Sequence, residues 1–294
     1  MLDYPALAAL RAVLREGSFE RAAAVLGVTP SAISQRVRGL EERIGAVLVI
    51  RGQPCTPTAL GSRLCAHADR VHLLEADLAP LLPEAAAGHA PTIRIAVNAD
   101  SLATWFPDAI AGFGRDGSTL LDLVLDDESR TAARLRAGEV LAAVTADPEP
   151  AQGCRTIPLG AMRYAACASP AFLARHFPDG VTATALAAAP HLRFDRRDTL
   201  QARWAQAAHG VSLAGPTHFV PSPHAFLDLA LAGLGWGLHP LALAAPHLAA
   251  GRLVELPPAQ PLDVALYWTV ARLHAAPLRR LTRDVAAAAR RHLA

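Results

Sequence analysis

The stretch SFERAAAVLGVTPSAISQRVRGLEERIG, residues 18–45, contains two short helical patterns with a sharp break between them. The first pattern runs over residues 19–26, and the second begins at Pro30, after three intervening residues. Ser18 and Thr29 are suited to start the two helices, because a hydroxyl accepts a hydrogen bond from the free N–H groups there. Proline at the first helical position costs no hydrogen bond. Two helices joined by so tight a turn predict a helix-turn-helix.

The second helix of this pair has an apolar face and a polar face. Its apolar residues recur at steps of four, three and four, which makes one stripe on a helix: Ile33, Val37, Leu40 and Ile44. The start of a recognition helix meets base edges in the major groove, where Gln pairs with adenine and Arg with guanine. The predicted DNA-binding residues are Thr29, Pro30, Ser31, Ser34, Gln35, Arg36, Arg38 and Arg51, of which Arg36 and Arg51 would reach phosphates. The alternative is a solvated face on an ordinary helix pair.

The N-terminal part of the chain is basic, although the whole chain carries a net charge of only +2. Residues 11–70 contain nine arginines against five acidic residues. The chain contains no lysine, so contacts with phosphate must come from arginine, polar side chains or backbone N–H groups. This local excess of positive charge favours a polyanionic partner.

Two further patterns follow the helix pair. Residues 46–51 are rich in β-forming residues and precede a turn at 52–57, which predicts a short β-wing. From Thr58 onward, steps of four and three alternate as in a coiled-coil seam: Leu60, Leu64, His67, Val71, Leu74 and Leu78. A helix with so narrow an apolar stripe needs a partner helix, and a second copy of the chain, paired as a dimer, is the simplest way to supply one. The alternative is that the stripe packs on its own chain.

The chain after Pro91 has the pattern of an α/β domain. Strands are expected at 92–98, 121–125 and 140–145, with a helix at 101–113, kinked at Pro107, and another at 130–136. This alternation predicts parallel βαβ units. Further strands are expected at 164–168, 192–195, 218–221, 236–239, 253–256 and 264–270, with a closing helix at 278–293.

These motifs resemble a known family. FERAAAVLGVTPSAISQRVRGLEERIGAVLVIR, followed by TPTALG, resembles the LysR-type transcriptional regulators, and the resemblance spans the whole chain. VNADSLATW, RLRAGEVLAAV and LYWTVAR are similar to the ArgP/LysG-like branch, which controls the export of basic amino acids.

The resemblance implies an α/β protein with three parts. These are a winged helix-turn-helix over 1–57, a linker and dimerisation helix over 58–87, and a two-lobed effector domain over 91–294 that resembles periplasmic binding proteins. Lobe I would take about 91–161 and 267–294, and lobe II about 162–266. The resemblance further implies an activator that binds double-stranded promoter DNA as a homodimer or homotetramer. RNA polymerase is a further expected partner, the effector is lysine, arginine or histidine, and no cofactor is expected.

The first effector-binding residues are expected where the first α/β strand ends. Ligands of open α/β sheets bind beyond the carboxyl ends of the strands, and here Asp100 and Ser101 follow that end at the start of a helix. Free N–H groups at a helix start suit a carboxylate, and Asp100 suits an ammonium group, so an α-amino acid would match both. The alternative is that Asp100 and Ser101 merely cap the helix.

The remaining candidates lie at other strand ends. Residues 126–128 form an acidic cluster that could take a cationic side chain, or else a solvated turn. His224 stands where close members of the resembling branch carry an acid, so ligand preference here could differ from theirs. The full set of further candidates is Asp126, Glu128, Thr145, Asp195, Ser222 and His224, whereas His239 is expected to be structural.

Other classes of protein fit the sequence less well. The four cysteines are scattered without a CxxC pair, so reduced thiols are expected and a metal site is not. No apolar run reaches the roughly 20 residues of a membrane span, and no signal-peptide pattern is present, which predicts a cytoplasmic protein. An α/β enzyme with a helical dimerisation domain would need a catalytic motif such as GxSxG or a P-loop, and the sequence contains neither. A nonspecific architectural DNA-binding protein would leave the two-lobed domain unexplained.

Overall fold

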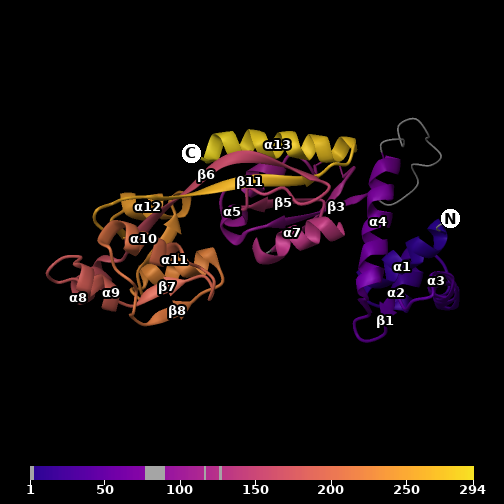
Figure 1. Cartoon of the computed structure of the whole chain (residues 1–294), viewed down its shortest axis with the longest axis horizontal. Coiled ribbons are helices and arrows are strands. Elements are labelled where there is room, and N and C mark those ends of the chain that lie inside the picture. Colours follow the sequence, from indigo (N-terminus) through magenta and orange to yellow (C-terminus); the bar gives the residue numbers. More distant parts are fainter. Residues whose placement is uncertain (1–2, 77–89, 116, 126–127) are drawn as a thin grey trace.

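The computed structural model describes residues 3–76, 90–115, 117–125 and 128–294. The chain is elongated, with a small helical domain at one end, the helix α4 beside it, and two α/β lobes beyond (Figure 1). This arrangement confirms the expected fold class of a winged helix-turn-helix, a linker helix and a two-lobed α/β domain.

The N-terminal domain consists of α1 (Tyr4–Glu16), α2 (Phe19–Leu26) and α3 (Pro30–Ile44), followed by the antiparallel pair β1 (Val49–Ile50) and β2 (Thr56–Pro57). The hydroxyls of Ser18 and Thr29 accept hydrogen bonds from backbone N–H groups and so cap α2 and α3, as the sequence predicts. The apolar stripe of α3 is buried in one core with α1. Burial of that face leaves the opposite face of α3 to solvent.

The wing is fixed to the rest of the domain by hydrogen bonds from its backbone to the side chain of Glu41. Glu41 Oε1 accepts hydrogen bonds from the N–H groups of Leu48 and Val49, at 2.8 and 3.3 Å. Helix α4 (Ala59–Ala76) begins beside the wing, where a Cβ on Gly61 would lie 2.1 Å from the carbonyl oxygen of Leu48. Only glycine therefore allows α4 to pass so close to the wing.

The predicted seam of α4 is divided between two cores. Leu64 packs against the N-terminal core, and Leu73, which is not a seam position, is fully buried in the core of the effector domain. Leu60 and Leu74 are exposed in this single chain. Leu78 lies outside the described residues. The structure contains one chain, so dimerisation through α4 stays a prediction.

Lobe I is a sheet covered on both faces. Its parallel strands are β3 (Thr92–Val97), β4 (Leu120–Leu125) and β5 (Ala142–Thr145), and β11 (Leu262–Ala271) joins antiparallel to β5. Helices α6 (Phe106–Ile110) and α13 (Ala276–His292) lie on one face and α7 (Glu128–Ala137) on the other (Figure 1). The predicted parallel βαβ units are confirmed in this lobe.

One helix prediction is wrong. Instead of a single kinked helix over 101–113, the chain forms α5 (Ala99–Ala103) and α6. The break lies at Thr104, whose backbone is not helical, and the next side chain, Trp105, is buried and donates its indole N–H to Ser101 Oγ. Pro107 sits in the first turn of α6, where a missing N–H costs nothing.

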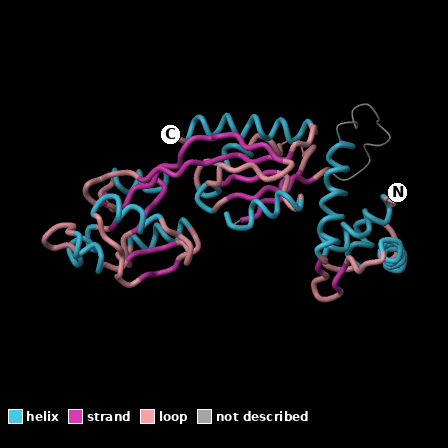
Figure 2. Tube along the Cα trace, viewed as in Figure 1, coloured by secondary structure: helices cyan, strands magenta, loops and turns pink. Residues whose placement is uncertain are grey.

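Strands β6 (Cys154–Ala168) and β11 link the two lobes and are called the hinge strands here, and β6 is much longer than expected. The strand predicted at 164–168 is the end of β6, which runs antiparallel to β11 from lobe I into lobe II (Figure 2). The strand passes through Pro158 and Gly160 without a break. A register shift at Leu266/Tyr267 absorbs the irregularity, and Gly160 has a φ of 124° with the backbone of Ala294 packed against it.

Lobe II is built around the far end of β6. Strands β9 (Gly237–Pro240) and β10 (Val254–Glu255) pair with β6, and the short strands β7 (His191–Arg193) and β8 (Thr217–Phe219) pair with each other. The surrounding helices are α8 (Pro170–His176), α9 (Ala183–Ala188), α10 (Leu200–His209), α11 (Pro223–Leu231) and α12 (Leu241–Ala249). Among the described residues, no helix has the length and apolar character needed to cross a membrane.

Candidate DNA-binding surface and effector site

The predicted DNA-binding residues lie on the outer face of α3 and on the wing. Thr29 caps the helix, with its Oγ1 3.2 Å from the N–H of Ala32, and Pro30 opens it. Most of these side chains are exposed, and Ser34 is half-buried at the edge of the face. The set placed on this surface is Thr29, Pro30, Ser31, Ser34, Gln35, Arg36 and Arg38.

The polar side chains of α3 are available for a ligand. Gln35, Arg36 and Arg38 make no hydrogen bond or ion pair with any described residue. By contrast, Arg43 at the end of α3 forms an ion pair with Asp3 at 3.1 Å, and this contact holds the pKa of Asp3 below its usual value. The first turns of α3 therefore present unpaired donors, whereas the last turn is tied to its own chain.

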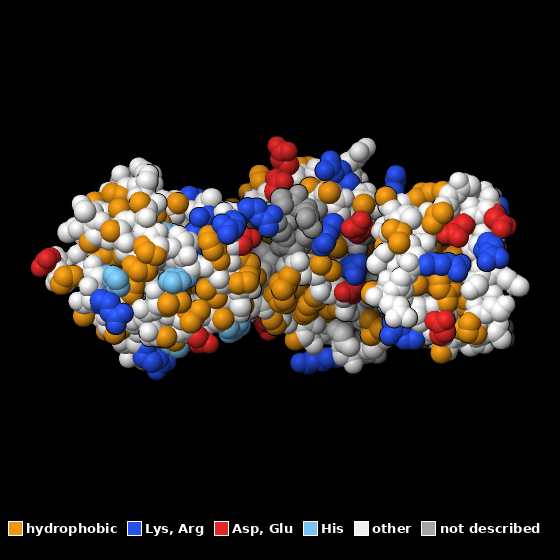
Figure 3. Space-filling model, turned by 90° about the horizontal axis from the view of Figure 1, so that it is seen from below, with side chains coloured by type: hydrophobic (Ala, Val, Ile, Leu, Met, Phe, Trp, Pro, Cys, Tyr) orange, Lys and Arg blue, Asp and Glu red, His pale blue; other side chains and the backbone are white. Residues whose placement is uncertain are grey.

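Arg51 of the wing stacks on the N-terminal domain. Its guanidinium carbon lies 5.1 Å from the centre of the Phe19 ring. This contact leaves the planar donors of Arg51 exposed beside α2. Arginine side chains are scattered among acidic ones over the face shown in Figure 3, so the basic character of the N-terminal domain is not one broad patch on that face.

Asp100 and Ser101 lie at the start of α5, beyond the carboxyl end of β3. The cap of α5 is Asn98, whose Oδ1 accepts the N–H of Ser101 at 2.8 Å, so the side chains of Asp100 and Ser101 do not serve as the cap. Ser101 is buried, and its Oγ accepts the indole N–H of Trp105 at 3.1 Å. The half-buried carboxylate of Asp100 accepts the hydroxyl of Tyr164 at 2.7 Å.

The charge state of Asp100 is set by competing effects. Its pKa is raised to about 6, chiefly by burial; the hydrogen bond from Tyr164 lowers the pKa, and the carboxylate of Asp198 in lobe II raises it. Asp100 is therefore close enough to lobe II to sense a charge there. A cation placed between the two carboxylates would relieve both the burial and the repulsion.

Of the other predicted effector residues of lobe I, only Thr145 has a side chain that the structure describes. Thr145 is buried at the end of β5, beside β3, and its Oγ1 accepts the N–H of Asp147 at 3.0 Å. Asp126 lies outside the described residues. Glu128 begins α7, but its side chain is not among those described.

Lobe II contributes a carboxylate that acts on Asp100 and that the sequence analysis missed, that of Asp198. Asp195 builds the turn after β7, accepting the N–H groups of Arg197 and Asp198 at 2.7 and 3.0 Å, and it pairs with the Arg197 side chain at 3.3 Å. Among the described residues, the carboxylate of Asp198 accepts hydrogen bonds only from the backbone N–H groups of Phe194 and Leu200, at 2.8 and 2.9 Å. The signal in the sequence was the second acid of the run Asp195-Arg-Arg-Asp198.

Ser222 and His224 open α11, which contacts α5 across the lobes. Ser222 is the cap of α11, with its Oγ 3.4 Å from the N–H of Ala225, and the His224 side chain is exposed. His239 is fully buried, and burial lowers its pKa to about 3, which fits a structural role. Of the predicted effector residues, the structure thus groups Asp100, Ser101 and Thr145 in lobe I, with Ser222 and His224 on the helix that meets α5.

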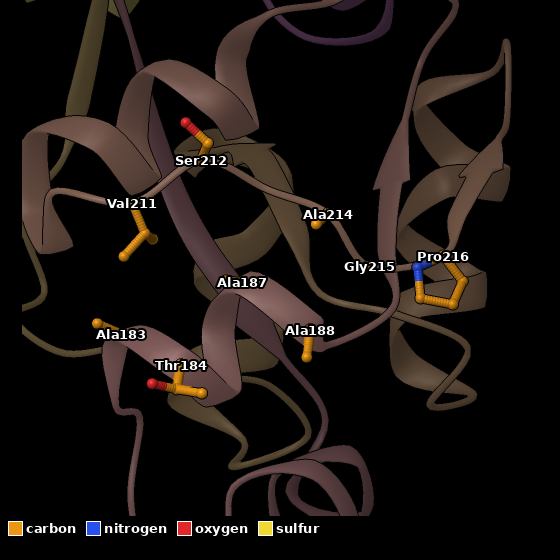
Figure 4. Close-up of a pocket in the computed structure, with 9 residues that line it drawn as sticks. All are labelled: Ala183, Thr184, Ala187, Ala188, Val211, Ser212, Ala214, Gly215 and Pro216. Atoms are coloured by element: carbon orange, nitrogen blue, oxygen red, sulfur yellow. The ribbon is translucent and has the colours of Figure 1, made fainter.

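A separate hollow in lobe II does not suit a charged amino acid. It has a volume of about 640 Å³ and lies between α9 and residues 211–216 (Figure 4). Its lining is mostly small and apolar, with Thr184 and Ser212 as the only side-chain hydroxyls. None of the predicted effector residues lines it, and no lining side chain carries a charge.

The sequence and the structure match one family over nearly the whole chain. Residues 5–62 match the bacterial regulatory helix-turn-helix protein of the lysR family, and residues 86–294 match the LysR substrate binding domain. The HTH-type transcriptional regulator ArgP of Pseudomonas fluorescens is 48% identical over 269 residues, which cover 91% of this chain and 90% of that protein.

Two solved structures show the same fold. The crystal structure of ArgP from Mycobacterium tuberculosis is 45% identical, covers 98% of each chain and has a TM-score of 0.80. Full-length LysG from Corynebacterium glutamicum, with bound effector Arg, is 39% identical, covers 99% of each chain and has a TM-score of 0.70.

Proposed function

The chain belongs to the LysR family of DNA-binding transcriptional regulators, and from this premise we propose that it activates basic amino acid export when it binds a basic amino acid. Its relatives are named as transcriptional regulators, so the enzyme alternative is set aside. The observation that carries the proposal is the Asp100 carboxylate, which lies between the lobes and has no cationic side chain bound to it among the described residues.

The DNA-binding part of the proposal rests on α3. We propose that Gln35 and Arg38 read base edges while Arg36 and Arg51 contact phosphates. All four side chains are exposed, and those on α3 make no hydrogen bond or ion pair with a described residue. Ser31 and Ser34 would contact the same groove, with Thr29 and Pro30 fixing the start of the helix. An architectural DNA-binding protein would not require this arrangement of base-reading side chains.

The effector part rests on charge. Asp100 would accept one cationic group of the ligand, with Ser101, Thr145 and Ser222 supplying polar contacts nearby. LysG of Corynebacterium glutamicum binds arginine, and we extend this ligand class to the present chain, with arginine, lysine and histidine as candidates. His224, Asp195 and the acidic residues 126–128 remain candidates for selecting among them.

The assembly part follows from α4. We propose the divisions 1–57, 58–87 and 91–294, with pairing through the exposed leucines of α4 giving a homodimer or a homotetramer on promoter DNA. Since the DNA partner is chromosomal, we place the protein in the cytoplasm, with RNA polymerase as its partner in activation.

A thermal-shift screen of the twenty amino acids on the full chain tests the proposed effector, because a ligand that binds only the folded state raises its melting temperature. Arginine, lysine or histidine is expected to raise the melting temperature and acidic amino acids are not. A response to acidic or apolar amino acids alone would refute the proposed ligand class. A mobility-shift assay on promoter and scrambled duplexes tests specific DNA binding in the same preparation.

A further inference from the structure

Tyr164 occupies the point where the hinge enters lobe II. On one side its backbone is in register with Leu262, the first residue of β11, and on the other with Pro240, the last residue of β9. Its ring is almost fully buried in the main core of the effector domain. The residue is therefore held by lobe II strands, while its hydroxyl reaches Asp100 in lobe I.

The bond between the two side chains is short and involves a charged acceptor. The Tyr164 hydroxyl donates to Asp100 Oδ2 at 2.7 Å, the distance expected for a hydroxyl on a carboxylate. Asp100 Oδ1 has no hydrogen-bond partner among the described residues. One oxygen of the carboxylate is thus fixed by the hinge, and the other is left for a ligand.

The surroundings of Asp100 give this bond a second effect. Burial and the Asp198 carboxylate both disfavour the ionised form of Asp100, and the bond from Tyr164 favours it. Helix α11, which contacts α5, carries His224 and Asp228, both exposed. Within the described residues, Tyr164 is the one side chain that acts to keep Asp100 charged.

We infer that Tyr164 is a positioning residue for effector recognition, whose hydroxyl orients and keeps ionised the Asp100 carboxylate that receives the cationic group of the effector. This inference rests on the proposed function. Because the bond joins the hinge to lobe I, a ligand that binds the Asp100 carboxylate also changes the hydrogen bond that Tyr164 donates to it. Effector binding at Asp100 would thereby alter a contact of the hinge strand β6.

The test compares Tyr164→Phe with Tyr267→Phe in the full chain. Tyr267 lies on the neighbouring hinge strand, and its hydroxyl has no hydrogen-bond partner among the described residues, so it controls for loss of a tyrosine hydroxyl. The binding of L-arginine and of L-lysine is measured by calorimetry from pH 5 to pH 8, a range in which neither ligand's side chain titrates.

The unchanged protein is expected to lose affinity for arginine as the pH falls through about 6, where Asp100 takes up a proton. Tyr164→Phe is expected to move this loss upward by roughly one pH unit, because the ionised form has lost a hydrogen bond. It should also weaken binding roughly fivefold or more at pH 8, where orientation alone is measured. Tyr267→Phe should follow the unchanged protein.

Coincident profiles for the two tyrosine variants would overturn the inference. Should Tyr164→Phe fail to fold, Tyr164→Leu, which also lacks the hydroxyl, takes its place, and the same upward shift of the loss of affinity is expected. Absence of any loss of affinity near pH 6 in the unchanged protein would show that the charge of Asp100 does not control binding and would overturn the inference as well. If the unchanged protein binds neither arginine, lysine nor histidine, the proposed function itself fails, and the two failures are thus distinguishable.

Discussion

Arg15 and Thr92 join the first helix of the DNA-binding domain to the first strand of the effector domain, with Nη1 and Oγ1 3.4 Å apart. The same guanidinium forms an ion pair with Asp69 of α4 at 2.9 Å. Four residues further along α4, Leu73 is fully buried in the effector-domain core. In this chain α4 is therefore docked on both domains, so a change in lobe I can bear on the orientation of α3.

Leu73→Ala tests whether this docking contributes to stability. Removal of a fully buried leucine is expected to lower the free energy of unfolding by roughly 2–5 kcal/mol, because both transfer energy and packing are lost. Leu120→Ala is the matched control, since Leu120 is exposed at the start of β4 and lies outside the proposed dimer seam, so its truncation should cost under about 0.5 kcal/mol. Urea unfolding of the full chain measures both. Equal effects of the two changes would show that the docking seen here is not maintained in solution.

The N-terminal domain could be predicted from the sequence because its signals are local. Ser18, Thr29 and Pro30 act on the helix that they begin, and the stripe of α3 has the period of a helix, so caps and buried face follow from neighbouring residues. The wing followed from β-forming residues next to a turn. Tertiary context adds little to these elements.

The effector domain could be predicted only in outline because its deciding contacts are not local. Strand β6 continues through Pro158 and Gly160 because β11, about a hundred residues later, pairs along its length. Trp105 breaks the expected helix by packing in the core. Asp198 matters only because lobe II brings it towards Asp100. No periodicity in the sequence contains that information.

Asp100→Asn should make the ligand-free protein more stable at neutral pH. The native pKa of Asp100, about 6, lies above its ordinary value of 3.8, so the native state binds more protons between these values. The free energy of unfolding must then fall as the pH rises from about 4 to 6. Replacement by Asn removes this loss and should add roughly 2–3 kcal/mol at pH 7.5, and little at pH 4.

Thermal or urea unfolding at the two pH values measures this difference. Asp228→Asn, an exposed acid on α11, serves as the control and should change stability by under about 0.5 kcal/mol at either pH. A loss of stability at pH 7.5 in Asp100→Asn would mean that the buried carboxylate stabilises the fold instead of serving a ligand.

Gln35→Ala and Arg38→Ala should relax the choice of DNA sequence. Each removes a predicted base contact, worth roughly 1–3 kcal/mol of discrimination, so affinity for the promoter should fall while affinity for random duplex changes little. Arg36→Ala is the contrasting variant. Loss of a phosphate contact should weaken binding to both duplexes and reduce the salt slope by about 1. Titration of labelled duplexes at several salt concentrations separates the two kinds of contact, and parallel losses in all three variants would contradict the base-reading role.

Two glycines in helices of the DNA-binding region should respond to alanine in opposite directions. A Cβ at Gly61 would lie 2.1 Å from the carbonyl oxygen of Leu48, so Gly61→Ala must push the wing away from α4 and should cost roughly 2 kcal/mol or more. At Gly39 in α3 nothing lies within 4 Å of the new methyl group, so Gly39→Ala should stabilise by roughly 0.5–1 kcal/mol through helix propensity. Chemical unfolding gives both values. Because the wing and α3 share one core, Gly61→Ala should also weaken promoter binding. If the Gly61→Ala protein is as stable as the original, the wing lies further from α4 than described here.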